Sequence, residues 1–125
     1  MKLVVTAFLS LDGVVQAPGG PDEDRSGGFR HGGWAAPYFD DAMLELINGS
    51  MGELDALLLG RRTYEIFAAH WPHLGDEDPI AARFNRIPKY VATRTLDTLA
   101  WQGSHRLEGD VVVYIRRVKR QPGQQ

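Results

Sequence analysis

The sequence has 125 residues, a length typical of one domain with a single hydrophobic core. With 14 Lys and Arg against 16 Asp and Glu, its net charge of -2 excludes a whole-molecule positive field for nucleic acid or an anionic membrane. The absence of cysteine excludes disulfides, thiolate metal ligands and a cysteine nucleophile. We therefore expect one domain over residues 1–125, and any anion site must be local.

The N-terminal segment is strongly apolar. Residues 3–10, LVVTAFLS, form the nearly continuous apolar run that is typical of a strand buried on both faces of a parallel sheet. Thr6 and Ser10 interrupt the run, and no small-residue cleavage site of a signal sequence follows it. No stretch approaches the ~20 apolar residues of a membrane span. We expect a first strand in a soluble, cytoplasmic protein.

A turn and a long irregular segment follow. Asp12 and Gly13 predict a turn at the end of the first strand. Residues 19–33 contain many glycines and show no periodicity. Long loops inside compact domains are often lids or binding loops, so we favour a functional loop over the alternative, a disordered insertion.

The central part of the chain alternates between helical and strand patterns. In chain order the patterns predict a helix over 38–50, a buried strand over 54–59, a helix from Arg62 or Thr63 to Pro72, a short helix from Pro79 to about Arg86 with Asp78 as N-cap, and a strand over 89–93. This alternation predicts an α/β layered sheet with mainly parallel strands, right-handed crossovers and flanking helices.

Two segments near the C-terminus are less regular. Trp101 and Gln102 suggest a brief extended segment. The stretch GDVVVYIRRVK is ambiguous, because three consecutive valines favour a strand while the apolar positions also form a helical stripe. With Asp110 as N-cap, we predict a helix.

The stretch LLLGRRTYEIF places glycine and two arginines directly after a buried strand. Gly60 is expected at the carboxyl end of that strand and the amino end of the next helix, where free backbone N–H groups favour an anion. Arg61 and Arg62 add positive charge, and Thr63 can donate a hydroxyl. In the alternative interpretation the arginines pair with acids such as Glu65, and the glycine only forms a turn. Spacing alone leaves both open.

The strand over 89–93 ends in a comparable way, with Thr93, Arg94 and Thr95. Because ligands of open α/β sheets bind outside the carboxyl ends of the strands, this second hydroxyl and guanidinium could complete a site for a ligand with several phosphates.

Several segments together resemble the dihydrofolate reductase-like superfamily. GRRTYE after an apolar strand is similar to the G-R-x-T-[WY]-E segment of dihydrofolate reductases, and the SLDG within FLSLDGVV resembles the reductase domain of bifunctional riboflavin-biosynthesis proteins, the RibD C-terminal domain. GGWAAPYFDDA and IPKYVATRTL also resemble small bacterial members that carry this domain. The resemblance runs from about residue 2 to residue 120.

The resemblance implies an NADPH-dependent reductase that transfers a hydride to a pterin-like or ribosylaminopyrimidine-like substrate, as 5-amino-6-(5-phosphoribosylamino)uracil reductase does in riboflavin biosynthesis. By analogy, the phosphates of NADPH would meet the segment 60–63, and the 2'-phosphate would meet Thr93 and Arg94. The backbone around Ala7 would meet the nicotinamide, and the loop after Gly13 would cover it. The cofactor would carry the hydride chemistry.

Hydride transfer to a C=N or C=O bond also needs a proton. Asp12, Asp40 and Asp41 are candidate donors, because partial burial can raise the pKa of a carboxyl group. The alternatives are a turn-forming role for Asp12 and helix N-terminal charge for the other two. Trp34 and Phe39 could stack on a planar substrate, although core packing explains them equally well.

The resemblance is incomplete at the C-terminus. Members of that family continue beyond the last helix with a strand, a Gly-rich turn that grips the cofactor pyrophosphate, and further strands. The sequence stops at Gln125 before these elements. Either the chain is a truncated member or another chain completes it. A homodimer is a separate expectation. The competing functional hypothesis is therefore a non-catalytic, nucleotide-binding or interaction module.

Two further constellations favour ordinary roles. His70 and His73 lie near three acids, but Pro72 breaks the helix that would align the two imidazoles, so we predict a solvated loop and no metal site. The basic residues Arg116, Arg117, Lys119 and Arg120 predict a solvated helix face. We expect a small-molecule substrate, and neither nucleic acid nor a membrane as partner.

Overall fold

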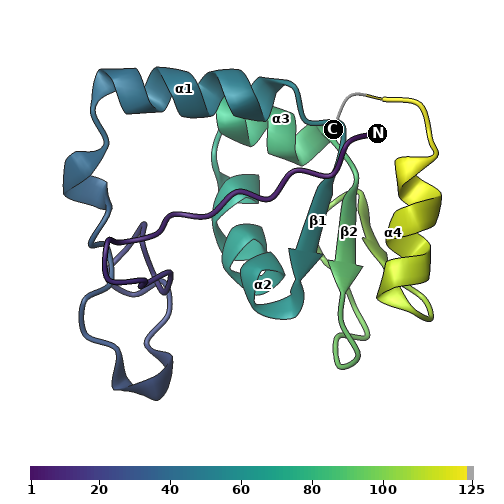
Figure 1. Ribbon diagram of the computed structural model, residues 1–125, viewed down its shortest axis with the longest axis horizontal. Coiled ribbons are helices and arrows are strands. Elements are labelled where there is room, and N and C mark those ends of the chain that lie inside the picture. Colours follow the sequence, from purple (N-terminus) through teal and green to yellow (C-terminus); the bar gives the residue numbers. More distant parts are fainter. Residues whose placement is uncertain (124–125) are drawn as a thin grey trace. The chain divides into compact units, whose positions relative to one another are not determined.

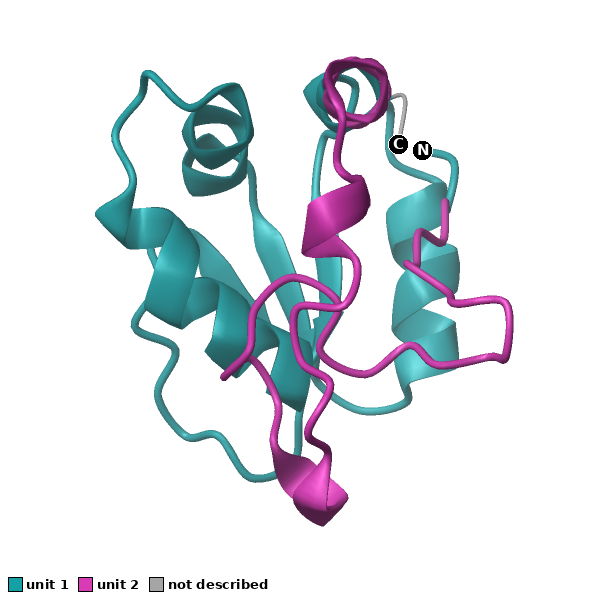
Figure 2. Cartoon of the chain, turned by 90° about the vertical axis from the view of Figure 1, so that its left-hand side faces the viewer, with its two compact units in different colours: residues 1–3, 48–125 teal, residues 4–47 magenta. Residues whose placement is uncertain are grey.

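The computed structural model describes residues 1–123 (Figure 1). The chain divides into two compact units, coloured separately in Figure 2: unit 1 contains Met1–Leu3 and the chain from Asn48 onward, and unit 2 contains Val4–Ile47. Its elements are η1 (Ser26–Gly28), η2 (Ala36–Tyr38), α1 (Asp41–Gly52), β1 (Leu57–Gly60), α2 (Arg61–His70), η3 (Trp71–His73), α3 (Pro79–Arg86), β2 (Lys89–Ala92), β3 (Ser104–Arg106) and α4 (Val111–Lys119). The expectation of a single domain stays a prediction.

Unit 1 is built on a three-stranded parallel sheet in the order β1-β2-β3. In the register, Leu57 pairs with Lys89 and Gly60 with Ala92, while Val91 pairs with Arg106. The helices α2 and α3 form the connection from β1 to β2, and α4 follows β3 (Figure 1). This arrangement confirms the predicted fold class, an α/β sheet with flanking helices.

Side chains of the strands alternate between the two faces of this sheet. One face forms the core of the unit, where Leu57, Leu59 and Val91 are buried with residues of the connecting segments: Tyr64, Phe84, Ile87 and Trp101. On the other face, Tyr90 packs against Tyr114 of α4 with ring centroids 5.7 Å apart. Both faces of the sheet therefore carry a layer of helix.

Local sequence signals explain where the helices begin and end. Asp78 accepts hydrogen bonds from the N–H groups of Ile80 and Ala81, both at 2.9 Å, and Asp110 accepts one from Val113 at 3.0 Å. These caps confirm the predicted starts of α3 and α4. Pro72 lies within η3, directly after α2, as expected for a residue that cannot continue a helix.

The helix predicted over 38–50 exists with shifted bounds. Pro37 lies in η2, and Asp40 caps α1 by accepting a 2.8 Å hydrogen bond from the N–H of Met43. The helix therefore begins at Asp41 and ends at Gly52. The strand predicted over 54–59 corresponds to β1, which is shorter and begins at Leu57. Its side chains alternate between buried and exposed, and Leu58 is exposed.

The predicted strand over 3–10 is wrong for this structure. No strand is assigned there, and Val5 and Leu9 are 88% and 63% exposed. A strand needs a hydrogen-bonding neighbour, and within the described chain none pairs with this segment. The extended segment expected at Trp101 and Gln102 is also wrong, because Trp101 turns into the core and the strand begins three residues later, at Ser104.

Unit 2 contains the turn and the irregular segment that the sequence predicts. The N–H of Gly13 donates to the carbonyl of Ser10 at 3.0 Å, and Gly13 has a φ of +90°, which glycine tolerates best. Residues 19–33 contain turns and the single short helix η1. The N–H of Gly33 donates to the carbonyl of Ala17 at 2.8 Å, which closes this irregular segment.

No helix within residues 1–123 has the length and apolar character needed to cross a bilayer.

Candidate anion site at the carboxyl ends of the strands

The carboxyl ends of β1 and β2 lie at one edge of the sheet (Figure 1). Because Gly60 pairs with Ala92 in a parallel register, the residues that follow them, Arg61 and Thr93, leave the sheet at the same level. The structure thus brings together the two segments that the sequence singled out as a phosphate site.

The N-terminus of α2 is open to an incoming anion. Gly60 is its N-cap with an extended backbone, no side chain caps it, and no acidic residue lies in its first turn. A Cβ added at Gly60 would meet no atom within 4 Å, so space adjoins the backbone here. The first N–H groups of this helix and its dipole are therefore available to a negative charge.

The side chains around this helix end are exposed and basic. Arg61, Arg62 and Thr63 are all exposed. Among residues 1–123, none of the ion pairs involves Arg61 or Arg62, so the structure does not show the alternative pairing with Glu65. Two guanidinium groups thus adjoin an uncapped helix N-terminus.

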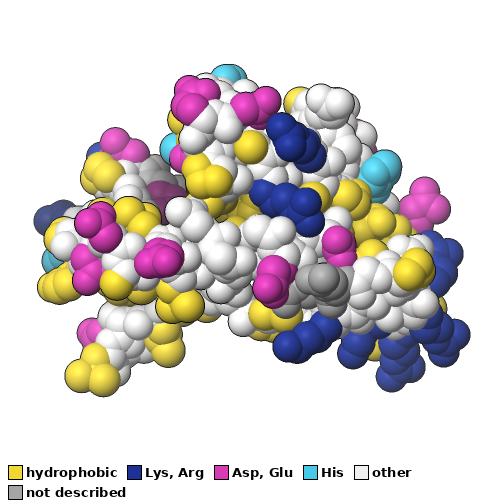
Figure 3. Space-filling view, turned by 90° about the horizontal axis from the view of Figure 1, so that it is seen from above, with side chains coloured by type: hydrophobic (Ala, Val, Ile, Leu, Met, Phe, Trp, Pro, Cys, Tyr) yellow, Lys and Arg dark blue, Asp and Glu magenta, His cyan; other side chains and the backbone are white. Residues whose placement is uncertain are grey.

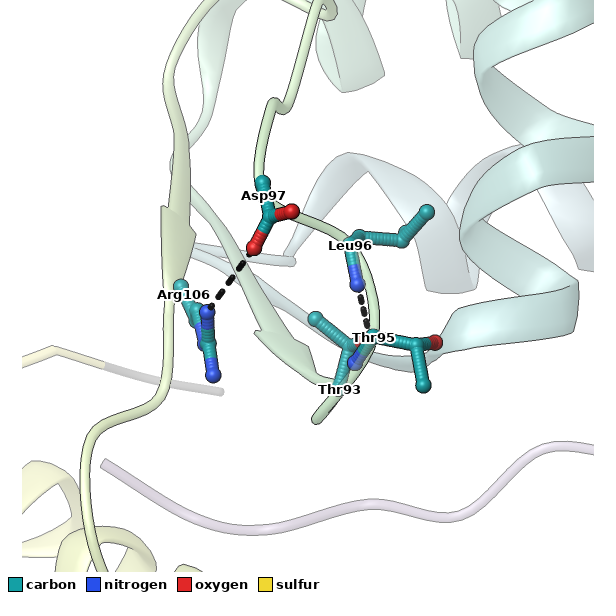
Figure 4. A network of polar contacts seen from close by, with 5 residues as sticks. All are labelled: Thr93, Thr95, Leu96, Asp97 and Arg106. Carbon is teal, nitrogen blue, oxygen red and sulfur yellow. Dashed lines mark hydrogen bonds and ion pairs between the residues drawn. The ribbon is translucent and has the colours of Figure 1, made fainter.

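The loop after β2 is ordered by a threonine (Figure 4). Thr93 Oγ1 accepts hydrogen bonds from the N–H groups of Thr95 at 3.3 Å and Leu96 at 3.2 Å. The same loop carries Asp97, which lies 4.0 Å from Arg106 of β3. Arg94 follows Thr93 in this loop and is exposed. None of the ion pairs in the described chain includes Arg94.

Buried hydrogen bonds and a cation–π contact connect the elements around this site. Tyr64 of α2 accepts a 3.0 Å hydrogen bond from the N–H of Trp101. Lys89 is 0% exposed, donates to the carbonyls of Asn85 at 3.2 Å and Gln102 at 2.9 Å, and lies 4.4 Å from the ring centroid of Trp101. Burial lowers the pKa of Lys89 to about 8. The Tyr64 contact ties the first turn of α2 to the segment that follows β2, and the Lys89 contacts tie β2 to α3 and to the same segment.

Sequence reasoning missed both Arg106 and Lys89. Arg106 is a further cation next to the carboxyl end of β3, and it was overlooked because the strand was expected at Trp101 rather than at Ser104. Gly103, with a φ of +74°, is the signal for a turn immediately before that strand. No sequence signal shows that Lys89, at the start of β2, is buried rather than exposed.

The remaining expected cofactor residues belong to unit 2. Ala7 is exposed and does not lie on a strand, and Gly13 forms the turn. Asp12 is exposed and accepts a 2.6 Å hydrogen bond from Ser10 Oγ, which lowers the pKa of its carboxyl group. The pKa of Asp12 is thus lowered, not raised as expected of a proton donor, and its carboxylate bonds within the turn. Its catalytic role stays a prediction.

The other expected catalytic and substrate residues also have structural partners in unit 2. Asp40 is the N-cap of α1, and Asp41 begins the helix. Trp34 donates its indole N–H to the carbonyl of Gln16 at 2.9 Å. Phe39 packs edge-on against Phe8, with ring centroids 5.3 Å apart. Their catalytic and substrate-binding roles stay predictions.

The histidine and arginine clusters have simple surroundings. The His70 ring packs edge-on against the Trp71 ring, with ring centroids 4.8 Å apart. No three His, Asp or Glu side chains within residues 1–123 lie close enough to hold a metal ion. Figure 3 shows Lys and Arg side chains gathered on the side of the molecule where α4 lies, and the last turn of that helix contains Arg116, Arg117 and Lys119. All three are exposed, as a solvated face requires.

A three-stranded parallel sheet with flanking helices makes this an α/β domain, and its architecture is consistent with the dihydrofolate reductase-like fold. The chain belongs to the RibD C-terminal domain family, whose model matches residues 1–120. The family is associated with riboflavin-biosynthesis reductases and is generally NADPH-binding. A search of curated proteins finds no match to the chain.

Proposed function

We propose that the protein is an NADPH-dependent reductase that transfers a hydride to a pterin-like or ribosylaminopyrimidine-like substrate. The observation that carries the proposal is the uncapped N-terminus of α2 with Arg61 and Arg62 beside it, at the strand edge where α/β sheets bind ligands. Membership of the RibD C-terminal domain family supports the choice of NADPH over other anionic ligands.

The residues at this edge fit the phosphates of NADPH. The N–H groups after Gly60 can donate to a phosphate oxygen, and the space beside that glycine lets the ligand approach the backbone. Arg61 and Arg62 can form charge-assisted hydrogen bonds to the same group, and Thr63 can add a hydroxyl donor. Arg94, on the loop after β2, is assigned to the 2'-phosphate.

When bound, the nicotinamide supplies the hydride. The protein binds the phosphates, orients the cofactor and excludes water from the reacting carbon. We assign the required proton to Asp40 or Asp41, because the pKa of Asp12 is shifted away from that role. The same proposal places the nicotinamide against the backbone near Ala7, under the loop that follows Gly13. It also stacks the substrate on Trp34 or Phe39.

NADPH binding is the first test of this proposal. Because the phosphates are expected to meet Arg61 and Arg62, replacing either with Ala should weaken binding by about 1–3 kcal/mol, or roughly 5- to 150-fold in Kd. The Kd is measured by titration with NADPH, followed by tryptophan fluorescence. Arg86→Ala removes an exposed arginine from the C-terminal end of α3 and should leave the Kd unchanged. An equal Kd in all three variants would argue against the site.

Turnover is the second test, and it separates the reductase from a non-catalytic nucleotide-binding module. The purified chain is mixed with NADPH and a ribosylaminopyrimidine or dihydropterin substrate, and loss of NADPH absorbance is followed. Substrate-dependent oxidation supports the reductase. Saturable NADPH binding without oxidation of any such substrate would favour the module, and no binding at all would exclude both.

A further inference from the structure

Arg106 is the last residue of β3, at the same edge of the sheet where β1 and β2 end. In the parallel register, Leu59 pairs with Val91, and Val91 pairs with Arg106. Residues paired in this way point to the same face of a sheet. Leu59 and Val91 are buried on the face that packs against Tyr64 of α2. The side chain of Arg106 therefore leaves the sheet on the face that α2 covers.

The candidate anion site extends along this edge from β1 to β3. Neighbouring strands are about 4.8 Å apart, so roughly 10 Å separates the end of β1 from the end of β3. Arg61 lies at one end of this span and Arg106 at the other, and the loop with Arg94 follows the strand between them. A ligand that meets all three cations needs negative charge on two separate groups. NADPH has them in its pyrophosphate and its 2'-phosphate, whereas NADH has only the pyrophosphate.

The guanidinium group of Arg106 makes one weak ionic contact. Arg106 Nη1 lies 4.0 Å from Asp97 Oδ1, and the Arg106 side chain is 45% exposed (Figure 4). This distance is longer than a hydrogen bond, which spans about 2.7–3.2 Å for a nitrogen donor. The contact with Asp97 thus leaves the N–H donors of the guanidinium group unused, and a phosphate can accept two of them at once.

The loop after β2 holds Asp97 beside Arg106. Leu96 and Leu99, on either side of Asp97 in the sequence, pack partly buried against the core cluster, and Thr93 Oγ1 accepts a 3.2 Å hydrogen bond from the N–H of Leu96. The side chain of Asp97 itself is 96% exposed. Because an exposed ion pair contributes little to stability, a ligand anion can replace this carboxylate without disturbing the fold.

We propose that Arg106 is a second cation, beside Arg94, for the 2'-phosphate of NADPH, and that this phosphate replaces the carboxylate of Asp97. This assignment rests on the proposed function, because it adds residues to the same cofactor site. In the free chain Asp97 is the ionic partner of Arg106. When NADPH binds, the 2'-phosphate takes the guanidinium donors and the carboxylate turns to solvent. Arg106 therefore favours NADPH over NADH, and Asp97 weakens that preference.

The Kd values for NADPH and NADH test the role of Arg106. Arg106→Ala should raise the Kd for NADPH at least about 5-fold and leave the Kd for NADH unchanged, because only NADPH carries the 2'-phosphate. Titrations followed by tryptophan fluorescence measure both values. Arg86→Ala is the matched control, since Arg86 forms a similar exposed pair with Asp76 at 3.7 Å and ends the helix that leads into the amino end of β2. It should change neither value, and an unchanged ratio in Arg106→Ala would overturn the proposal.

Asp97→Asn should change the affinity in the opposite direction, which a damaged fold would not do. Release of an exposed ion pair should make NADPH bind about 2- to 5-fold more tightly and affect NADH less. Asp76→Asn removes the acid of the control pair and should have no effect. In the Arg106→Ala background, Asp97→Asn should no longer tighten NADPH binding. An equal gain with and without Arg106 would show general repulsion and contradict the exchange of partners.

Arg61→Ala separates the role of Arg106 from the proposed function as a whole. Both cofactors carry the pyrophosphate, so this variant should bind NADPH and NADH more weakly by a similar factor. If it does, while Arg106→Ala leaves the ratio unchanged, the cofactor site stands and the role of Arg106 is wrong. If the natural chain binds neither cofactor, both are wrong.

Discussion

Lys89 is a buried charge that makes the stability of the protein depend on pH. Its pKa is about 8 in the folded chain, against an ordinary value of 10.5. Between these pH values the unfolded chain binds more protons than the folded chain, so the free energy of unfolding should rise as the pH increases from about 8 to about 10.5. Urea unfolding followed by tryptophan fluorescence across this range measures the slope.

Lys89→Met provides the matched comparison, because methionine has a similar shape and no charge. The two proteins share every other titratable group. The difference between the two curves therefore isolates Lys89. We expect the variant to lack the part of the slope that lies between about pH 8 and 10.5. Parallel curves would show that Lys89 keeps an ordinary pKa in the folded chain.

Arg94 is the residue expected to discriminate NADPH from NADH. It is exposed on the loop that Thr93 orders, at the carboxyl end of β2. If Arg94 meets the 2'-phosphate, Arg94→Ala should raise the Kd for NADPH about 10-fold or more and leave the Kd for NADH unchanged. Titrations with both cofactors measure this. An equal loss for both would indicate a general electrostatic effect instead.

At the scale of elements, the segments with strong local signals were predictable. Asp78, Asp110 and Pro72 define helix ends through hydrogen bonds and ring geometry that depend only on their neighbours in sequence. The strand β3 was misplaced, because its three residues have no distinctive pattern and its position depends on pairing with β2. The prediction of a strand over residues 3–10 was wrong for the same reason. A strand forms only with a hydrogen-bonding partner, and the local sequence does not say whether one is present.

The N-cap of α3 gives a direct test of these local signals. Asp78 accepts two backbone hydrogen bonds, so Asp78→Ala should lower the free energy of unfolding by about 1 kcal/mol. Glu77→Ala removes the same charge from the neighbouring exposed position and should have an effect below about 0.5 kcal/mol. Chemical unfolding of both variants gives the two values. A similar loss in both would attribute the effect to charge rather than to capping.

For the whole molecule, the sequence predicted the position of the phosphate-binding residues better than the surroundings of the catalytic and substrate residues. Gly60 and Thr93 were brought together correctly, because parallel strands place their carboxyl ends at one edge and the pairing of β1 with β2 follows from a single crossover. The roles of Asp12, Trp34 and Asp40 depended on how irregular segments fold. There the side chains bond locally to a serine hydroxyl, a backbone carbonyl and a helix N-terminus, which residue spacing does not reveal.

The two compact units should also differ in local stability. Unit 1 contains a cluster of buried apolar side chains between its sheet and helices, whereas the buried apolar residues of unit 2 are Ala17 and Ala35. Because local opening is controlled by burial and by hydrogen bonding, amides of β1 and β2 should exchange with solvent at least about 100-fold more slowly than amides within 19–33. Hydrogen exchange at low protein concentration, with peptide-level mass spectrometry, measures this ratio. Similar rates in both segments would mean that the chain opens as one cooperative unit and that the smaller core of unit 2 does not set its stability.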